Sequence, residues 1–181
     1  MKRLQTERLV LRPYTETDFN AFSKMHSDPV LKANTHAKPM NRLQARNLFE
    51  GYNEAFSKDG FGMWNVRRRD DDQYAGECGL WYRTELEGYS LRYILQKAQW
   101  NQGFSIEAVR AVLADSFTQH GLECVHAIAM HHNNRSVRVL ERVGFKQVSD
   151  DFRNVLGFNR YKLTNKEWCA GYALPPARGV S

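Results

Sequence analysis

The sequence is poor in cysteine and contains no long apolar run. Its three cysteines, Cys78, Cys124 and Cys169, lie far apart, are odd in number and form no Cys-x-x-Cys pair. This pattern disfavours a zinc ribbon and a disulfide framework, and it favours a reducing compartment, so we expect a cytoplasmic protein. No apolar segment approaches the ~20 residues of a membrane-spanning helix, and residues 1–8 lack the apolar core of a signal peptide. We therefore expect no membrane partner.

The length and charge of the chain predict one domain with anionic partners. Of its 181 residues, 42% are hydrophobic, which suffices for a sizeable core. We expect a single domain over residues 1–165 and an irregular tail over residues 166–181. The net charge of +6 favours anionic ligands in general. The only dense basic block, residues 67–69, is followed directly by three aspartates, which is typical of a solvated hairpin tip. Nucleic acid is therefore not an expected partner.

The hydrophobic pattern predicts a mixed α/β fold. Strands are expected over residues 4–11, 61–67, 73–83, 87–95, 123–130, 145–149 and 155–163. Helices are expected to begin at Thr15 and at Asn41, and two more are expected over residues 103–119 and 133–143. Between the first two helices, Asp28-Pro29 and Lys38-Pro39 bracket a segment that we expect to be irregular. No internal repeat is present.

A glycine loop connects the fourth expected strand to the third helix. Residues 100–105 read Trp-Asn-Gln-Gly-Phe-Ser. Gly103 lets backbone N–H groups converge on one point, and the following helix start adds partial positive charge, so a phosphate or pyrophosphate would fit there. The loop lacks both the Gly-Lys-Ser/Thr of a P-loop and the three glycines of a dinucleotide fingerprint. By itself, the loop is better interpreted as a tight turn.

A second motif follows about thirty residues later and supports the interpretation of the loop as a phosphate-binding site. Residues 133–145 read Asn-Asn-Arg-Ser-Val-Arg-Val-Leu-Glu-Arg-Val-Gly-Phe. Together the two motifs resemble the cofactor-binding core of the GNAT superfamily of acyl-CoA N-acyltransferases, and most closely its branch of ribosomal-protein N-terminal acetyltransferases. That branch reads roughly Trp-x-x-Gly-x-Ala-x-Glu-Ala and then Asn-x-x-Ser-x-x-x-Leu-Glu-x-x-Gly-Phe. The matching residues are Trp100, Gly103, Ser105 (for Ala), Glu107, Ala108, Asn133, Ser136, Leu140, Glu141, Gly144 and Phe145.

The resemblance, which extends from about residue 4 to about residue 165, implies the fold and the cofactor. The implied GNAT fold has a mostly antiparallel, twisted sheet of about seven strands, splayed at strands 4 and 5 and flanked by about four helices. The implied cofactor is acetyl-CoA, with its pyrophosphate on the backbone amides of the loop and its pantetheine arm along residues 93–95. The candidate cofactor-binding residues are Tyr93, Ile94, Leu95, Trp100, Asn101, Gln102, Gly103, Phe104, Ser105, Asn133, Ser136 and Leu140.

Ser136 is the candidate catalytic residue. Asn133, Ser136 and Leu140 are spaced i, i+3 and i+7, so they share one helix face. Many superfamily members carry a tyrosine as general acid at the position of Leu140, and this chain does not. The resemblance places Ser136 near the thiol, where it would protonate or hydrogen-bond the leaving thiolate. Simple capping of the helix start is an equally weighted interpretation for Ser136. Asn133 could bond the pantetheine amide or cap the helix, and we expect Asn133 and Asn134 to divide these two roles.

No residue stands out as the general base. The branch's usual Glu-x-Gly-Tyr reads Ser90-Leu91-Arg92-Tyr93 here, so Ser90 replaces the carboxylate. Four carboxylates could take its place, and each is more typical of a surface residue; they are Glu77, Glu87, Asp150 and Asp151. Alternatively, water could relay the proton of an N-terminal amine, whose pKa is ~8.

Adjacent histidines do not make a metal site in this sequence. His131 and His132 would point to opposite faces of a strand, and no third ligand is suitably spaced. We therefore expect no metal cofactor.

Taken together, the sequence predicts an enzyme, an N-acetyltransferase that moves acetyl directly from acetyl-CoA to a primary amine. The resemblance favours a protein N-terminus, such as that of a ribosomal protein, as the acceptor. A small-molecule or aminoglycoside-type amine is one alternative. A non-catalytic CoA-binding module is another, because the usual Glu and Tyr are missing, and a basic nucleic-acid binder is a third. The sequence leaves a homodimer open.

Overall fold

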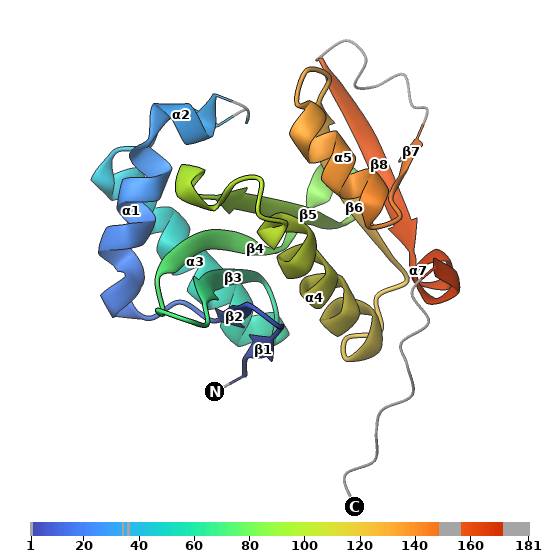
Figure 1. Ribbon diagram of the computed structural model, residues 1–181, viewed down its shortest axis with the longest axis horizontal. Coiled ribbons are helices and arrows are strands. Elements are labelled where there is room, and N and C mark those ends of the chain that lie inside the picture. The colour runs from blue at the N-terminus through green and yellow to red at the C-terminus, as the bar shows by residue number, and fades with distance from the viewer. Residues whose placement is uncertain (1, 34, 36, 149–156, 172–181) are drawn as a thin grey trace, which may run out of the picture.

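The computed structural model describes residues 2–33, 35, 37–148 and 157–171. Within these residues, eight strands form one sheet in the order β1-β2-β3-β4-β5-β6-β8-β7, and every neighbouring pair is antiparallel except β5 with β6 (Figure 1). The strands are β1 (Leu4–Gln5), β2 (Leu9–Arg12), β3 (Met63–Arg68), β4 (Tyr74–Arg83), β5 (Gly88–Leu95), β6 (Cys124–Met130), β7 (Lys146–Val148) and β8 (Phe158–Thr164). The expected mixed α/β architecture with a mostly antiparallel sheet is confirmed.

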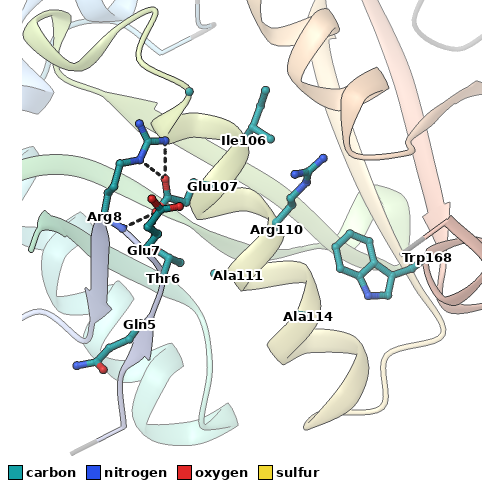
Figure 2. A pocket seen from close by; sticks show the side chains of 11 residues that line it. Gln5, Thr6, Glu7, Arg8, Ile106, Glu107, Arg110, Ala111, Ala114 and Trp168 are labelled. Atoms are coloured by element: carbon teal, nitrogen blue, oxygen red, sulfur yellow. Dashed lines mark hydrogen bonds and ion pairs between the residues drawn. The ribbon is translucent and has the colours of Figure 1, made fainter. Parts of the chain in front are cut away.

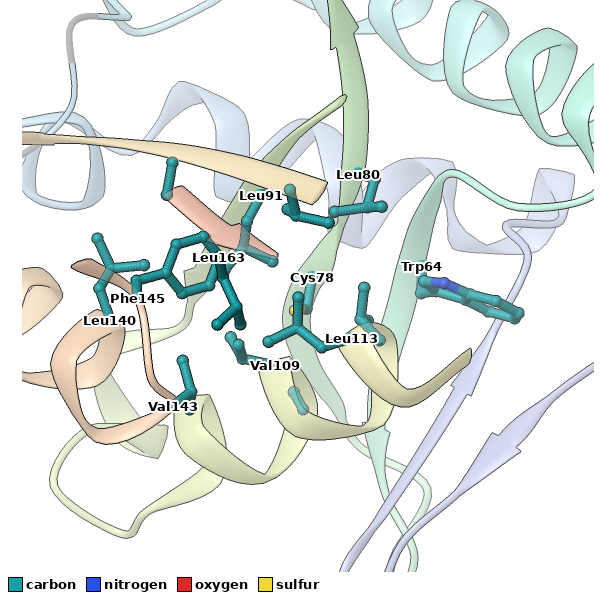
Figure 3. Packing of buried hydrophobic residues seen from close by; sticks show 14 of the residues in the cluster. Trp64, Cys78, Leu80, Leu91, Val109, Leu113, Leu140, Val143, Phe145 and Leu163 are labelled. Atoms are coloured by element: carbon teal, nitrogen blue, oxygen red, sulfur yellow. The ribbon is translucent and has the colours of Figure 1, made fainter. Parts of the chain in front are cut away.

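Helices cover the two faces of the sheet unequally. They are α1 (Phe19–Ser27), α2 (Pro29–Lys32), α3 (Arg42–Asp59), α4 (Phe104–Thr118), α5 (Asn134–Arg142) and α7 (Asn165–Gly171). One hydrophobic cluster joins α4, α5 and α7 to one face of the sheet (Figure 3). A second cluster joins α1, α2 and α3 to β3, β4 and β5, and contains no described residue of β6 or β8. The far half of that second face therefore has no helix packed on it in the described part of the chain.

The central helix α4 is held by an apolar stripe. Ala108, Val109, Val112 and Leu113 are all at most 1% exposed, at the spacing expected of a core-facing helix. Burying a side chain such as Val or Leu contributes roughly 1.5–3 kcal/mol relative to leaving it in water. This packing fixes the start of α4, and with it the glycine loop, against the sheet.

Residues 4–11 form a hairpin rather than the single strand that their alternation predicts. β1 pairs antiparallel with β2, Leu4 opposite Leu11. Thr6 makes the turn, because its hydroxyl accepts the N–H of Leu9 at 2.9 Å and its own N–H donates to the carbonyl of Leu9. A side chain that hydrogen-bonds the backbone locally favours a turn over an extended strand.

Two segments expected to be irregular are partly helical. Asp28 caps α2 by accepting the Val30 N–H at 2.7 Å, with Pro29 at the first helical position. Residues 166–171 of the expected tail belong to α7, where Glu167 accepts the N–H of Thr164 at 3.0 Å and Trp168 is 4% exposed in the core. The prediction of an irregular tail is therefore wrong over these residues, and residues 172–181 lie outside the described part of the chain.

Candidate functional site

A fork in the sheet is the central feature of the site. β5 and β6 pair only through Ser90 with His126 and Leu91 with Ala127, although β5 continues to Leu95. Beyond Leu91 the two strands diverge, so the edge of β5 that faces β6 has no strand partner in the described residues. This is the expected splay between the fourth and fifth predicted strands. Unpaired strand edges present hydrogen-bonding groups that an extended ligand can satisfy.

A cleft of about 350 Å³ opens beside this fork. Its lining residues come from α2 and the segment after it, the end of β5, the glycine loop with the start of α4, and α5. They are Leu31, Thr35, Tyr93, Ile94, Leu95, Gln99, Trp100, Asn101, Gly103, Phe104, Ser105, Ile106, Asn133, Arg135, Ser136, Arg138, Val139 and Arg142. Ten of the twelve candidate cofactor-binding residues are thus brought together.

The other two candidates lie elsewhere. Leu140 is 1% exposed and packs with Val143 and Phe145 in the core, because the apolar face of α5 turns toward the sheet (Figure 3). Gln102 is exposed, and its carboxamide donates to the carbonyl of Ala98 at 2.7 Å. Neither side chain lines the cleft.

The glycine loop adopts the backbone that its sequence requires. Gly103 precedes α4 with φ +80°, a conformation that side chains other than glycine rarely adopt. Trp100 closes the loop onto the sheet by donating its Nε1–H to the carbonyl of Leu95 at 2.9 Å. The first N–H groups of α4 have no partner within the helix and carry its positive dipole end. The loop therefore suits an anionic group.

Arg8 and Glu107 hold this loop from behind (Figure 2). The Glu107 carboxylate accepts the Thr6 hydroxyl at 2.5 Å and Arg8 Nε–H at 2.8 Å, while Arg8 Nη1–H donates to the carbonyl of Gln102 at 2.9 Å. Burial alone would raise the pKa of Glu107, but these donors hold it below its ordinary value. The same residues line a hollow of about 550 Å³ along α4. We interpret this ion pair as a support for the loop.

Two hydroxyl groups meet inside the cleft. Ser136 Oγ lies 2.9 Å from the phenol oxygen of Tyr93, which also donates to the Ser136 carbonyl at 3.2 Å. The Ser136 N–H donates to Asn133 Oδ1 at 3.1 Å, so Asn133 caps the helix and Ser136 Oγ does not. Burial raises the pKa of Tyr93, which keeps the phenol protonated. The sequence analysis selected Tyr93 for its backbone only, and its phenol was missed.

Three arginines on α5 line the cleft and were also missed. Arg135, Arg138 and Arg142 are spaced i, i+3 and i+7, so they lie on one helix face, and all three are exposed. The guanidinium of Arg135 lies 4.7 Å from the centre of the Trp100 ring. The spacing of these arginines could have been recognised in the sequence. The sequence analysis considered only Asn133, Ser136 and Leu140 on this helix, so the arginines were overlooked. These cations suit a ligand with several phosphate charges.

The candidate bases differ from the surface carboxylates that we expected. Glu77 is fully buried, where it accepts His26 Nε2–H at 3.0 Å and the Tyr52 hydroxyl at 3.3 Å. Burial would raise its pKa, but His26 and the neighbouring cations Arg92 and Lys32 lower it to about 2. Glu77 is thus a weak base away from the cleft lining. Glu87 is exposed in a turn, and residues 150 and 151 lie outside the described part of the chain.

No group of three potential metal ligands occurs among the described residues. His131 and His132 are exposed after the end of β6, outside the cleft lining. Within the same part of the chain, no helix is both long and apolar enough to cross a membrane.

The fork in the sheet, the glycine loop before α4 and the basic helix α5 meet at one cleft. The chain belongs to the acetyltransferase (GNAT) domain family, whose model matches residues 8–146. A similar protein is the uncharacterized N-acetyltransferase YoaA of Bacillus subtilis, 25% identical over 146 residues that cover 80% of this chain and 82% of the relative. The protein is an N-acetyltransferase, as the sequence predicts.

Solved structures show the same fold. An acetyltransferase from Agrobacterium tumefaciens superposes with a TM-score of 0.80 at 21% identity, covering 90% of this chain and 94% of that one. RimL, a ribosomal L7/L12 alpha-N-protein acetyltransferase solved with coenzyme A, gives 0.77 at 14% identity over 90% and 98%. A spermidine N-acetyltransferase from Vibrio cholerae, solved with CoA and spermine, gives 0.74 at 16% identity over 90% and 99%.

Proposed function

We propose that this protein transfers acetyl from acetyl-CoA, held in the β5–β6 fork, directly to a primary amine. The observation that carries the proposal is the fork between β5 and β6. Within the described residues, the edge of β5 that faces β6 is unpaired beyond Leu91, and it extends from the Tyr93 and Ser136 hydroxyls toward the start of α4. The loop amides and the arginines of α5 suit the phosphates, and the edge of β5 suits the amide-rich arm. Leu140, which is buried in the core, is left out of this site.

The reaction needs a free amine and a proton for the departing sulfur. Acetyl-CoA supplies an acyl carbon that its thioester activates. The amine forms the new C–N bond, loses one proton to water and displaces the sulfur as a thiolate. We assign proton donation to the Ser136 hydroxyl, with the phenol of Tyr93, 2.9 Å away, supporting it, and the proton that the amine released to water replaces the one that Ser136 gives to the sulfur. Because Glu77 is buried and only weakly basic, no carboxylate is assigned as base.

We propose a protein N-terminus as the acceptor. An α-amine, with a pKa of ~8, releases its proton to water near neutral pH and so needs no strong fixed base, whereas a lysine amine at ~10.4 would need one. The fold shared with the L7/L12 acetyltransferase is compatible with this choice. A small amine is the alternative, compatible with the fold shared with the spermidine enzyme.

The experiment that tests the function is thiol release from acetyl-CoA with a panel of amines, followed across pH. We expect release that requires both substrates and survives EDTA. With a peptide acceptor, kcat/KM should rise about tenfold per pH unit below the amine's pKa and then level, because only the free amine attacks. The raised pKa of Tyr93 keeps the phenol that supports Ser136 protonated over that range.

Two results would count against this account. A pH profile that is flat from pH 6 upward would require a fixed base, which the described residues of the site do not include. Thiol release that is lost with EDTA and restored by zinc would require a metal centre and remove the assignment to the hydroxyl pair.

A further inference from the structure

On the face of the sheet opposite α4 and α5, no helix of the described part of the chain packs over β6 and β8, although Ser90 and His126 of this face are buried. The helices α1, α2 and α3 pack on β3, β4 and β5 only, as far as the described residues go. Because strand side chains alternate, one set projects onto this uncovered area. We call it the open face; it consists of Ser90, Arg92, His126, Ile128, Arg160 and Lys162, which the strand pairing places in register.

The open face adjoins the point where the fork closes. The last residues that β5 and β6 pair are Leu91 and Ala127, so the next residue of β5 on the open face is Arg92. Tyr93, its neighbour, points to the opposite side, toward Ser136 and the cleft. If acetyl-CoA occupies the cleft as proposed above, an acceptor that reaches the thioester from the free side passes over Arg92. This step rests on the proposed function.

Cationic side chains lie at and beside Arg92. The Arg92 side chain is 31% exposed, while its partner Glu77, 3.6 Å away, is fully buried and also binds His26 and Tyr52. The buried Glu77 carboxylate therefore holds the Arg92 guanidinium in place, while its own negative charge is not exposed at the surface. On one side of Arg92 lies Lys32, 3% exposed, whose Nζ is 2.9 Å from His26 Nδ1. Burial lowers the Lys32 pKa to about 8, with a further contribution from the charge of Arg92.

The β8 side of the open face is basic as well. Arg160 and Lys162 are both half-buried there. After burial, their charges are the causes that lower the pKa of His126, which places both cations near that ring. His126 is 7% exposed, and its Nδ1 has no hydrogen-bond partner among the described residues. A buried polar atom of this kind is normally satisfied by water or ligand.

We infer that the acceptor carries an anionic group, a carboxylate or a phosphate, close to the amine that is acetylated. This group binds Arg92 with the amine directed to the closed end of the fork, while Lys162, which pairs with His126 on the same face of the sheet, adds positive charge. Hydrogen bonds between an anion and a guanidinium are strong and geometrically specific. A polyamine is disfavoured, because its further ammonium groups would lie against like charges with little water to screen them.

Matched acceptor pairs test this inference. One pair is two short peptides that differ only by Asp against Asn at the second position, and the other is phosphoethanolamine against ethanolamine; spermidine is the fifth acceptor. We expect the anionic member to have a kcat/KM about 10-fold higher or more, as for one hydrogen bond between charged groups. The preference should shrink with added salt. A preference in the peptide pair indicates a protein N-terminus, and one in the ethanolamine pair a small molecule.

Substitutions at two positions assign the preference to the open face. Lys162→Gln should reduce the ratio within the preferred pair several-fold, and Arg92→Lys should lower it less than Arg92→Gln. Lys166→Gln, an exposed position on α7 outside this face, is the matched control and should change nothing. Arg92 also neutralises the buried Glu77 carboxylate, so Arg92→Gln could prevent folding. In that case the Lys162→Gln variant alone tests the inference.

Equal rates within both pairs, or spermidine as the best acceptor, would overturn the inference while leaving the N-acetyltransferase activity intact. The same holds if the anionic preference survives unchanged in the Lys162 and Arg92 variants. Absence of thiol release with every acceptor would instead contradict the proposed function.

Discussion

Ser136→Ala is expected to lower kcat by about 10-fold or more with little change in CoA affinity. Ser136 Oγ lies in the cleft, does not cap its own helix, and has the buried phenol of Tyr93 at 2.9 Å. Proton donation to a leaving group contributes ~10²–10⁴-fold in many enzymes. A loss confined to kcat and kcat/KM, with unchanged CoA binding, marks an interaction made mainly in the transition state.

Tyr93→Phe separates the two hydroxyls. If Tyr93 acts through Ser136, its removal should cost less than Ser136→Ala, and the double variant should fall well short of the product of the two effects. Ser116→Ala is the matched control, because Ser116 is a buried serine of α4 that bonds the carbonyl of Val112 outside the cleft. Full activity in the Ser136→Ala, Tyr93→Phe double variant would remove both residues from the chemistry.

Gly103→Val is expected to weaken CoA binding by about 100-fold. Gly103 has φ +80°, and a Cβ there would meet the Arg8 guanidinium at 3.4 Å. A β-branched residue cannot hold this conformation cheaply, so the loop must shift and lose its approach to the phosphates. Two lost hydrogen bonds to a charged group, at about 1.5 kcal/mol each, account for that factor. Isothermal titration with CoA measures it.

The matched control is Gly121→Val. Gly121 has φ +62° and open space around its Cβ position, and it lies outside the cleft. It should lower stability through the same backbone strain without changing the CoA dissociation constant. Equal CoA affinity in wild type and Gly103→Val would show that the loop does not hold the phosphates.

The glycine loop could be predicted from the sequence because its parts are local, whereas the fork was implied only by the family resemblance. A strand, a glycine with positive φ and a helix follow one another within residues 88–118, and the second motif supplies the opposite wall of the cleft. The Thr-x-x-Glu capping pattern that starts α7 at Thr164 was equally local but was overlooked.

The burial and hydrogen bonding of Glu77 could not be predicted from a local sequence pattern. Its burial depends on His26 and Tyr52, which are 51 and 25 residues distant in sequence, and on how α1 and α3 pack against β4. The Tyr93 phenol poses the same difficulty, because its partner Ser136 is 43 residues away. Long-range packing decides whether a carboxylate is a base or a buried counter-ion, and the spacing of residues does not.

The central claim is that the β5–β6 fork holds coenzyme A, and a thermal-shift titration with CoA tests it most directly. At a concentration of about 100 times the dissociation constant, linkage adds about 2.7 kcal/mol to the free energy of unfolding. For a chain of this length, that corresponds to a rise in midpoint of roughly 5–10 °C, which Gly103→Val should abolish and Gly121→Val should retain. A midpoint that stays unchanged up to millimolar CoA would contradict the account.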